Sequence, residues 1–296
     1  MAKLMDLKKD IKNKRELVNI VIDRYLPRKD EYPKVLHKAL RHILFAGGKR
    51  IRPYLTITTY NMLGHNDEKI LLVAGAIEIF HTYTLIHDDL PSLDNDDYRR
   101  GVKTSHIEFG EDIALLAGDA LLTFGFDLLN QVDMPTKTKV KMIKEFSEVL
   151  GAEGIIGGQC VDILSEGKQV SKKTLNYIHL NKTAKLFTLS VRAGAYMANA
   201  KEENFRRLTR YGETVGLLFQ IVDDILDIEG TRKKLGKEPG SDARKLKATY
   251  PKIYGLKEAK VKADELREKA EKIISHYGEK AIYLKKICKF IRYREF

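Results

Sequence analysis

The chain has 296 residues, a formal net charge of +12 and 43% hydrophobic residues, a composition that fits a folded globular protein and excludes an intrinsically disordered one. No uninterrupted apolar run approaches the roughly 18 residues that a membrane span needs, and the start MAKLMDLKKD lacks the apolar centre of a signal peptide. The two cysteines, Cys160 and Cys288, form no recognisable framework, so we expect a cytoplasmic protein.

Apolar residues recur at spacings of three and four along most of the chain, a pattern that predicts helices. The expected helices cover residues 12–26, 33–46, 68–90, 111–130, 136–164, 172–199 and 203–229. Most of the seven prolines lie at their boundaries, and strand-like alternation is scarce. Because the chain shows no repeat, linker or low-complexity tract, residues 1–296 are predicted to form one all-α domain of about ten or more helices.

The first polar motif along the chain is GGKRIRP, residues 47–53. Its two glycines indicate the end of one helix, and Pro53 fits the first turn of the next. Lys49, Arg50 and Arg52 would then converge near a helix N-terminus, a position that favours a bound anion. A single basic motif is more often a solvated surface, so this one gains weight only beside the others.

A dense acidic cluster, HDDLPSLDNDDYRRG at residues 87–101, directly follows an apolar helical run. Its aspartates repel one another and oppose the dipole of the helix that they end, so a cation is expected to compensate them. Asp94 lies six positions after Asp88 and would point away from it on an ideal helix. Pro91 disfavours the α conformation at the residue before it, and we expect a break there to return Asp94 to the side of Asp88.

A second acidic motif, FQIVDDILD at residues 219–227, has a helical spacing. Gln220, Asp223 and Asp227 are three and four positions apart and form one stripe on a helix face. Oxygen ligands without a nearby histidine or cysteine pair suit Mg²⁺ better than Zn²⁺. One such motif alone is usually a solvated face or a helix cap, whereas two motifs that each end a long apolar helix favour a metal site.

Further basic residues supply candidate anion contacts. Arg99 and Arg100 form a donor pair with the geometry that phosphate prefers, and lysines follow in the later motifs, at Lys182, Lys237 and Lys247. Acidic metal sites and basic phosphate sites in one chain predict a metal-bridged polyphosphate and a second, directly bound anion.

The C-terminal part is strongly basic. From Arg232 to the end it holds 20 Lys and Arg residues against 9 Asp and Glu, so it carries +11 of the net +12. Nucleic acid, a membrane surface or a phosphorylated small molecule would each fit such a segment, and a solvated helix face is the simplest interpretation. For Arg292 and Arg294 in the tail KKICKFIRYREF we favour solvation.

Six motifs occur in one order: GGKRIRP, the DDxxxxD of HDDLPSLD with RRG after it, GGQxxD at 158–162, KT at 182–183, FQxxDDxLD, and GSDxxxxKATYP. Together they resemble the short-chain trans-polyprenyl diphosphate synthases of the bacterial farnesyl diphosphate synthase type, over residues 47–251. The resemblance implies an all-α fold around a deep central cavity and a homodimer. It also implies a transferase that condenses isopentenyl diphosphate with dimethylallyl and geranyl diphosphates, giving mainly farnesyl diphosphate. The cofactor would be Mg²⁺, several ions per site, with Mn²⁺ as an alternative ion.

The resemblance also implies roles for particular residues. The metal ligands would be carboxylates of the two acidic motifs: Asp88, Asp89, Asp94, Asp223 and Asp227. The allylic diphosphate and its ionisation would be served by Arg99, Lys182, Thr183, Gln220 and Lys237. Isopentenyl diphosphate would be bound by Lys49, Arg52, His81 and Arg100, and Lys247 would add a further substrate contact.

Product length in the resembling family depends on the residues four and five before the first aspartate, here Thr84 and Tyr83. A bulky Tyr83, about 7.5 Å along the helix from Asp88, would stop growth near fifteen carbons. It lies about 140° around the helix from Asp88, against about 40° for Thr84, so the block requires a cavity that extends to that side. A core tyrosine and a geranylgeranyl diphosphate synthase are the alternatives.

Three other classes compete with this interpretation. A class I terpene cyclase also pairs acidic helices with Mg²⁺ but needs no second diphosphate site, so GGKRIRP and His81 count against it. A basic helical nucleic-acid-binding protein would explain the basic C-terminal part. It would not explain FQIVDDILD, since aspartates repel phosphate unless a metal intervenes. A noncatalytic subunit of a prenyl synthase is disfavoured because both acidic motifs are intact.

Overall fold

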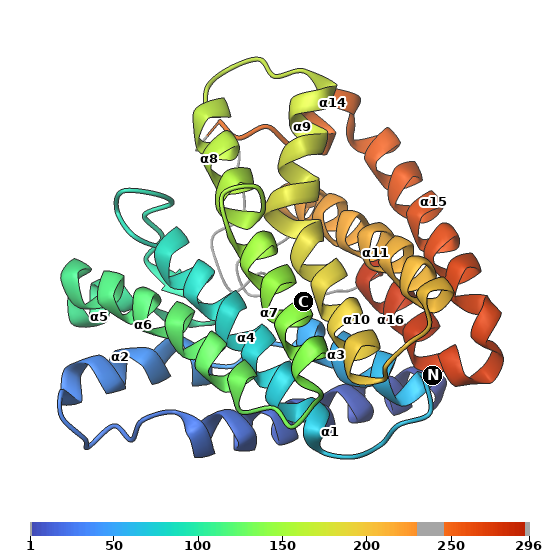
Figure 1. The fold of residues 1–296 in the computed structure, drawn as a ribbon. Coiled ribbons are helices and arrows are strands. Elements are labelled where there is room, and N and C mark those ends of the chain that lie inside the picture. Colours follow the sequence, from blue (N-terminus) through green and yellow to red (C-terminus); the bar gives the residue numbers. More distant parts are fainter. Residues whose placement is uncertain (1, 230–245, 294–296) are drawn as a thin grey trace.

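Helices form nearly all the regular structure in residues 2–229 and 246–293, the part that the computed structural model describes (Figure 1). The all-α prediction is confirmed. In chain order the α-helices are α1 (Ala2–Tyr25), α2 (Lys34–Phe45), α3 (Ile51–Met62), α4 (Lys69–Asp88), α5 (Ser105–Phe109), α6 (Glu111–Asn130), α7 (Thr136–Leu150), α8 (Ile155–Ser165), α9 (Lys172–Ile178), α10 (Lys185–Met197), α11 (Glu202–Glu229), α14 (Tyr250–Tyr254), α15 (Leu256–Ile274) and α16 (Ile282–Arg292). A 3₁₀ segment, η2 (Ser275–Ala281), joins α15 to α16.

The prediction of one helix over residues 136–164 was wrong, because the structure has two helices there. α7 ends at Leu150 and α8 begins at Ile155. Gly154 between them has φ −118° and ψ −126°, so it continues neither helix. A Cβ there would lie 1.9 Å from the Val149 carbonyl oxygen. Apolar periodicity continues across the break, so spacing alone did not reveal it.

The predicted helix at 172–199 is continuous but irregular. A π-helical turn, η1 (His179–Ala184), lies between α9 and α10. Single π turns inside α-helices are often found at functional positions. This one carries Lys182 and Thr183, and both α8 and α11 pack against it.

The core has two buried apolar clusters, and α3 and α10 contribute to both. The first lies around α4 and α6, with Ile77, Phe80 and Leu121 among its fully buried members. The second joins α3, α10 and α11 to α15 and α16 at the other side of the molecule. Among the described helices, α4 is long and apolar enough to pass a membrane-span test, but 72% of its most apolar stretch is buried in the first cluster. We therefore interpret α4 as a core helix.

The segment after α4 reverses direction twice. The Asp94 amide donates to the Asp88 carbonyl at 2.8 Å, so the chain folds back after α4. A two-residue hairpin follows, formed by β1 (Tyr98–Arg99) and β2 (Val102–Lys103). Its turn residues both have positive φ, 55° at Arg100 and 81° at Gly101. This turn sends the two neighbouring arginine side chains to different partners.

Candidate active site

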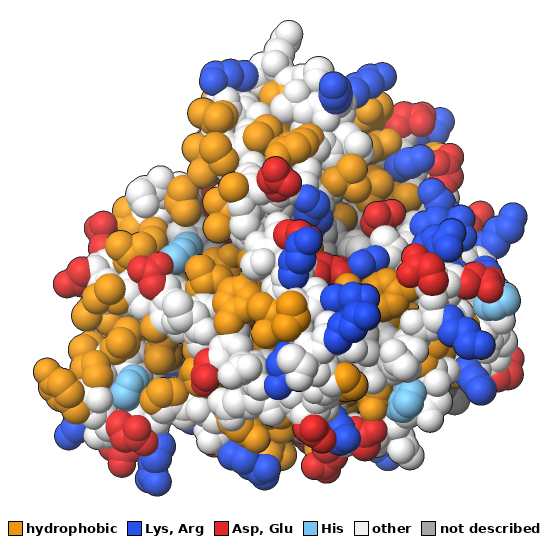
Figure 2. Space-filling model, in the orientation of Figure 1, with side chains coloured by type: hydrophobic (Ala, Val, Ile, Leu, Met, Phe, Trp, Pro, Cys, Tyr) orange, Lys and Arg blue, Asp and Glu red, His pale blue; other side chains and the backbone are white. Residues whose placement is uncertain are grey.

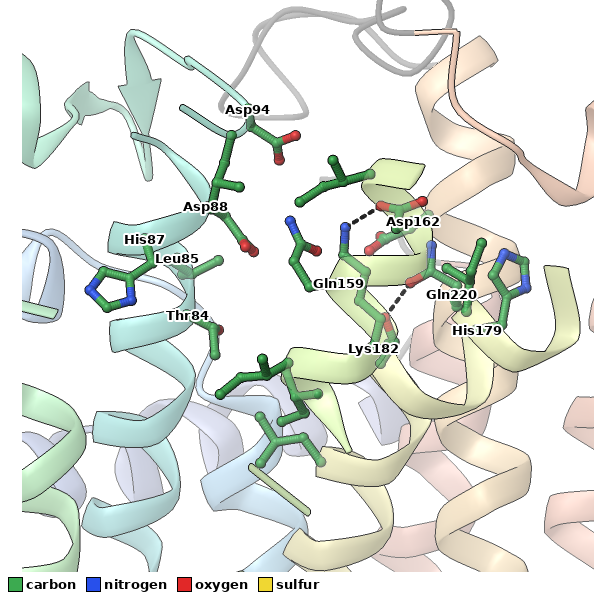
Figure 3. A pocket seen from close by; sticks show the side chains of 18 of the residues that line it. Thr84, Leu85, His87, Asp88, Asp94, Gln159, Asp162, His179, Lys182 and Gln220 are labelled. Carbon is green, nitrogen blue, oxygen red and sulfur yellow. Dashed lines mark hydrogen bonds and ion pairs between the residues drawn. The ribbon is translucent and has the colours of Figure 1, made fainter. Parts of the chain in front are cut away.

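One cavity of about 850 Å³ gathers most of the residues that the motifs singled out. Its walls come from α4 and α6 on one side and from α8, η1 and α11 on the other, and residues 247–249 also line it. Figure 3 shows Asp88 and Asp94 on the first wall, with Asp162, Lys182 and Gln220 facing them from the second.

The first acidic motif places Asp88 and Asp94 together at the cavity. The predicted break near Pro91 is confirmed, because the turn at 89–95 brings Asp94 back beside Asp88. Burial raises the pKa of Asp88; Lys182 opposes this shift, while Asp94 adds to it. Two carboxylates held this close favour a bound cation.

The second acidic motif lies on α11, and the helix face that carries its predicted stripe lines the same cavity. Gln220, Asp223 and Asp227 all line it, together with Asp224. The Thr183 hydroxyl donates to the Gln220 amide oxygen across the η1–α11 contact. The Gln220 amide nitrogen donates to Asp224 at 2.8 Å, which fixes the orientation of the amide. The oxygens of Thr183 and Gln220 are therefore held in a defined arrangement at the wall.

Two lysines lie among these carboxylates. Lys182 Nζ donates to Asp162 Oδ2 at 2.6 Å, and Lys247 Nζ donates to Asp94 Oδ1 at 2.8 Å. Although burial lowers the pKa of Lys182, Asp162 and Asp88 hold it above the usual value for lysine. The Lys182 ammonium is thus charged at neutral pH, and both lysines line the cavity, where they are placed to meet an anion that enters it.

The donor set fits Mg²⁺ that also takes oxygen ligands from a substrate. Asp88 and Asp94 face Asp223 and Asp227 across the cavity, and all four offer the hard oxygens that this ion prefers. Within the described residues no three His, Cys, Asp or Glu side chains form a metal cluster by themselves. An ion here would need further oxygens, which a diphosphate carries.

The GGKRIRP motif reaches the cavity through Arg52. Its Nη1 lies 3.1 Å from His81 Nε2, and its guanidinium lies 4.5 Å from the centre of the Phe187 ring. Burial, with Arg52 close by, lowers the pKa of His81 well below its usual value, so the imidazole is neutral. A neutral ring accepts a hydrogen bond from Arg52 and offers the other nitrogen as a donor.

Some predicted site residues do not line the cavity. Asp89 is buried, and its carboxylate binds Arg99, which does line the cavity. Arg100 binds Glu78 instead, through Nη2 at 2.7 Å. Lys49 lies with its ammonium 5.4 Å from the Phe290 ring centre. The direct contacts predicted for these three residues stay predictions, and Lys237 lies outside the described residues.

Figure 3 shows apolar side chains below Asp88 in the cavity, and the apolar residues that line the cavity include Leu122, Ile155, Ile178 and Leu186. Tyr83 and Thr84 both line the cavity, so it does extend to the side of α4 that carries Tyr83. Tyr83 is 3% exposed, and among the described residues nothing forms a hydrogen bond with its hydroxyl. An apolar channel below a charged mouth suits a hydrocarbon chain with a polar head.

Sequence reasoning missed three residues of this site. Asp162 belongs to the quoted GGQxxD motif but received no role, although it binds Lys182. Asp224 sits next to Asp223, and its spacing of four from Gln220 was the available signal. His179, 3% exposed and 3.3 Å from Asp224, could not be found from sequence because the pairing depends on the π turn.

The basic tail forms an internal contact rather than a solvated end at Arg292. Its Nη2 lies 2.8 Å from Asp264 Oδ2, and its Nε donates to the other oxygen of the same carboxylate at 2.9 Å. The prediction of solvation was wrong for this residue. Arg294 lies outside the described residues.

The comparisons with known proteins agree with one another. The family model described as polyprenyl synthetase matches residues 33–290. A geranylgeranyl diphosphate synthase of Cyanophora paradoxa is 43% identical over 94% of this chain and 93% of its own. A farnesyl diphosphate synthase of Geobacillus stearothermophilus is 42% identical over 96% of this chain and 97% of its own. The structure of a geranyltransferase from Helicobacter pylori, complexed with magnesium and isoprenyl diphosphate, has a TM-score of 0.86 at 29% identity and covers 96% of each chain.

Proposed function

The chain belongs to the polyprenyl synthetase family, and we propose that it condenses isopentenyl diphosphate with dimethylallyl and then geranyl diphosphate to give mainly farnesyl diphosphate. One observation carries the proposal. Two acidic motifs that are far apart in sequence face each other across one cavity, with lysines between them and an apolar channel beneath.

The polar mouth would bind and orient the allylic diphosphate. When bound between Asp88, Asp94 and Asp223, Mg²⁺ would supply positive charge that makes diphosphate a better leaving group. Arg99 and Lys182 place further positive charge at the same mouth. Lys182 exchanges its bond to Asp162 for one to the entering anion, which keeps its charge compensated.

The reaction breaks the bond between C1 of the allylic substrate and its diphosphate oxygen. The cation that forms bonds to the terminal carbon of the isopentenyl double bond, and loss of a proton restores a double bond. The Thr183 and Gln220 oxygens are held at the wall of the same cavity, where they would stabilise this developing charge. Apolar walls keep water away, and the departing diphosphate takes the proton.

Tyr83 supports a fifteen-carbon product because its bulky side chain is buried and lines the cavity, so that it would obstruct a longer chain. A geranylgeranyl diphosphate synthase is the second candidate. It is favoured by relatives of closely similar identity that carry either product name. Terpene cyclisation is disfavoured, since Arg52 and His81, which are in contact at the cavity, are proposed to bind a second diphosphate that a cyclase does not need.

We place the enzyme in the cytoplasm, as a homodimer that binds no nucleic acid. The view in Figure 2 shows hydrophobic side chains over α5 and α6, where Ile107, Leu115 and Leu116 are 45%, 47% and 52% exposed. Such a surface supports association with a second copy. Sedimentation of the wild-type protein and of Leu116→Lys, which should shift the mass toward a monomer, tests this part.

The test of the activity is an incubation with labelled isopentenyl diphosphate and each allylic primer in turn, with Mg²⁺, with Mn²⁺ and without a divalent ion. We expect condensation with Mg²⁺ and farnesyl diphosphate as the main product. A complete lack of condensation would refute the enzyme assignment, whereas a twenty-carbon main product would refute only the proposed product length.

A further inference from the structure

Glu78 is the one Asp, Glu, Lys or Arg residue between Lys69 and Asp88, the two ends of the apolar helix α4, and it is fully buried. Its Oε1 accepts a hydrogen bond from Arg50 Nη1 at 2.7 Å and another from Arg100 Nη2 at 2.7 Å. Desolvation of one carboxylate and two guanidinium groups is costly. A buried arrangement of this kind is therefore expected to serve a structural or functional purpose that offsets the cost. The two arginines come from the GGKRIRP motif and from the RRG turn.

On the first side, Arg50 precedes α3 in a left-handed conformation, with φ 53°. Residues with a side chain rarely adopt this region unless contacts hold them there. Its guanidinium bonds to Glu78, to the Leu44 carbonyl and to Asn19, the last at 3.2 Å. The backbone on either side of Arg50, which carries Lys49 and Arg52, is thereby fixed.

On the second side, Arg100 also has a left-handed backbone, and its Nη1 donates to the Ile43 carbonyl at 3.0 Å. A Cβ at Gly48 would lie 3.1 Å from Arg100 Nε, so the glycine lets the GGKRIRP turn lie directly on this side chain. Glu78 therefore joins two loops that also touch each other.

Arg99, the neighbour of Arg100, is held by a separate set of carboxylates. Its Nε donates to Asp89 at 2.9 Å, and its Nη2 donates to Asp96 at 3.0 Å. The hairpin turn thus divides the two arginines between two supports: Glu78 holds the side of the turn that faces GGKRIRP, and Asp89 with Asp96 holds the side that faces the cavity mouth.

Resting on the proposed function, we propose that Glu78 is a positioning residue for the isopentenyl diphosphate site. It locks the GGKRIRP turn onto the RRG hairpin and so sets Lys49, Arg52 and Arg100 in place. The allylic site depends instead on Asp89, through Arg99. Two buried carboxylates thereby support the two diphosphate sites separately.

The test is Glu78→Gln, which keeps the shape and removes the charge. We expect the KM for isopentenyl diphosphate to rise about tenfold, the effect of losing one charge-assisted hydrogen bond, while the KM for geranyl diphosphate changes less than about twofold. Titration calorimetry should show the same weakening for isopentenyl diphosphate alone. Asp89→Asn should give the reverse pattern, with the larger KM change for geranyl diphosphate.

Glu145→Gln is the matched control, because Glu145 also binds an arginine, Arg192, at 2.8 Å, but does not line the cavity. It should lower thermal stability without changing either KM. If Glu78→Gln behaves like this control, or raises both KM values equally, the inference is wrong. Arg50→Gln gives the same test should Glu78→Gln fail to fold.

Measuring the binding of isopentenyl diphosphate separately from product formation distinguishes the positioning role of Glu78 from the proposed activity. A wild-type protein that makes no product but binds isopentenyl diphosphate more tightly than Glu78→Gln would refute the proposed activity and keep the positioning role. A wild-type protein that binds no isopentenyl diphosphate would overturn both.

Discussion

At the scale of single residues, spacing predicted partners that share one helix and failed for partners on different elements. Gln220 and Asp223 were placed correctly on one face, because helical geometry fixes that relation locally. The site roles of Asp89 and Arg100 were implied by the family resemblance and not by their spacing. In the structure Asp89 binds Arg99 and Arg100 binds Glu78. These pairings depend on tertiary packing, which spacing did not reveal, and the ligand contacts of Asp89 and Arg100 stay predictions.

Asp223→Asn tests the second acidic wall. The substitution removes a negative charge that faces Asp88 across the cavity, so the mouth should hold Mg²⁺ and diphosphate less well. We expect kcat to fall by about 10²–10³, the usual effect of losing one electrostatic contact to the transition state, measured under saturating substrates. Asp133→Asn, at an exposed position paired with Lys69, is the control and should retain full activity. Equal activities in the two variants would contradict the assignment.

Tyr83→Ala tests the floor of the channel. The hydroxyl has no hydrogen-bond partner among the described residues, so its removal costs packing and leaves no buried donor behind. We expect the main product to lengthen by one isoprene unit, because the smaller side chain opens the wall, and product sizing by chromatography measures it. Thr84→Ser, a smaller change on the same wall, should leave the product unaltered. An unchanged product from Tyr83→Ala would make this residue a core tyrosine only.

At the scale of elements, the sequence predicted most helices and missed their irregularities. The ends of α6 and α11 agree with the apolar pattern, since long amphipathic stretches determine helices well. The apolar spacing gave no sign of the π turn η1, which the structure places in contact with α8 and α11. Its motif residues were found from their chemistry and not from a structural signal.

Gly158→Ala tests how α8 holds η1. A Cβ at this position would lie 2.3 Å from the Lys182 backbone nitrogen, so the two elements must separate. We expect a loss of stability of about 1–3 kcal/mol from overpacking, and a fall in kcat/KM for the allylic substrate because Lys182 moves with η1. Urea unfolding and steady-state kinetics measure the two effects.

Gly64→Ala is the control for ordinary glycine loss, because nothing lies within 4 Å of a Cβ there but its φ is +100°. It should destabilise the protein through backbone strain and leave kcat/KM unchanged. Should Gly158→Ala change stability alone, the link from α8 to Lys182 would be wrong.

At the scale of the whole molecule, charge is distributed unevenly between the surface and the interior. The chain as a whole carries a net charge of +12, whereas the buried carboxylate of Glu78 joins α4 to the GGKRIRP turn and the RRG hairpin. Composition indicated a basic protein, but it could not locate this buried carboxylate. Its effect on folding can be separated from the surface charge by pH.

Burial alone would raise the pKa of Glu78, but Arg50 and Arg100 hold it below the usual value of 4.5. A carboxylate whose pKa is lower in the folded state stabilises the fold above the unfolded pKa and loses this effect as pH falls through the folded pKa. At pH 7 we therefore expect Glu78→Gln to be less stable than wild type by about 3 kcal/mol, the lower range for breaking a buried pair.

This difference in the free energy of unfolding should shrink steadily as the pH falls below the usual glutamate pKa of 4.5, because the unfolded wild-type chain protonates Glu78 first and the folded protein follows only at lower pH. Urea unfolding of both proteins from pH 7 to pH 3 measures it, and the titration of every other group cancels in the difference. The pair is buried, so 1 M salt should leave the difference at pH 7 nearly unchanged. A difference that stays constant down to pH 3 would mean that Glu78 contributes through its shape and not through its charge.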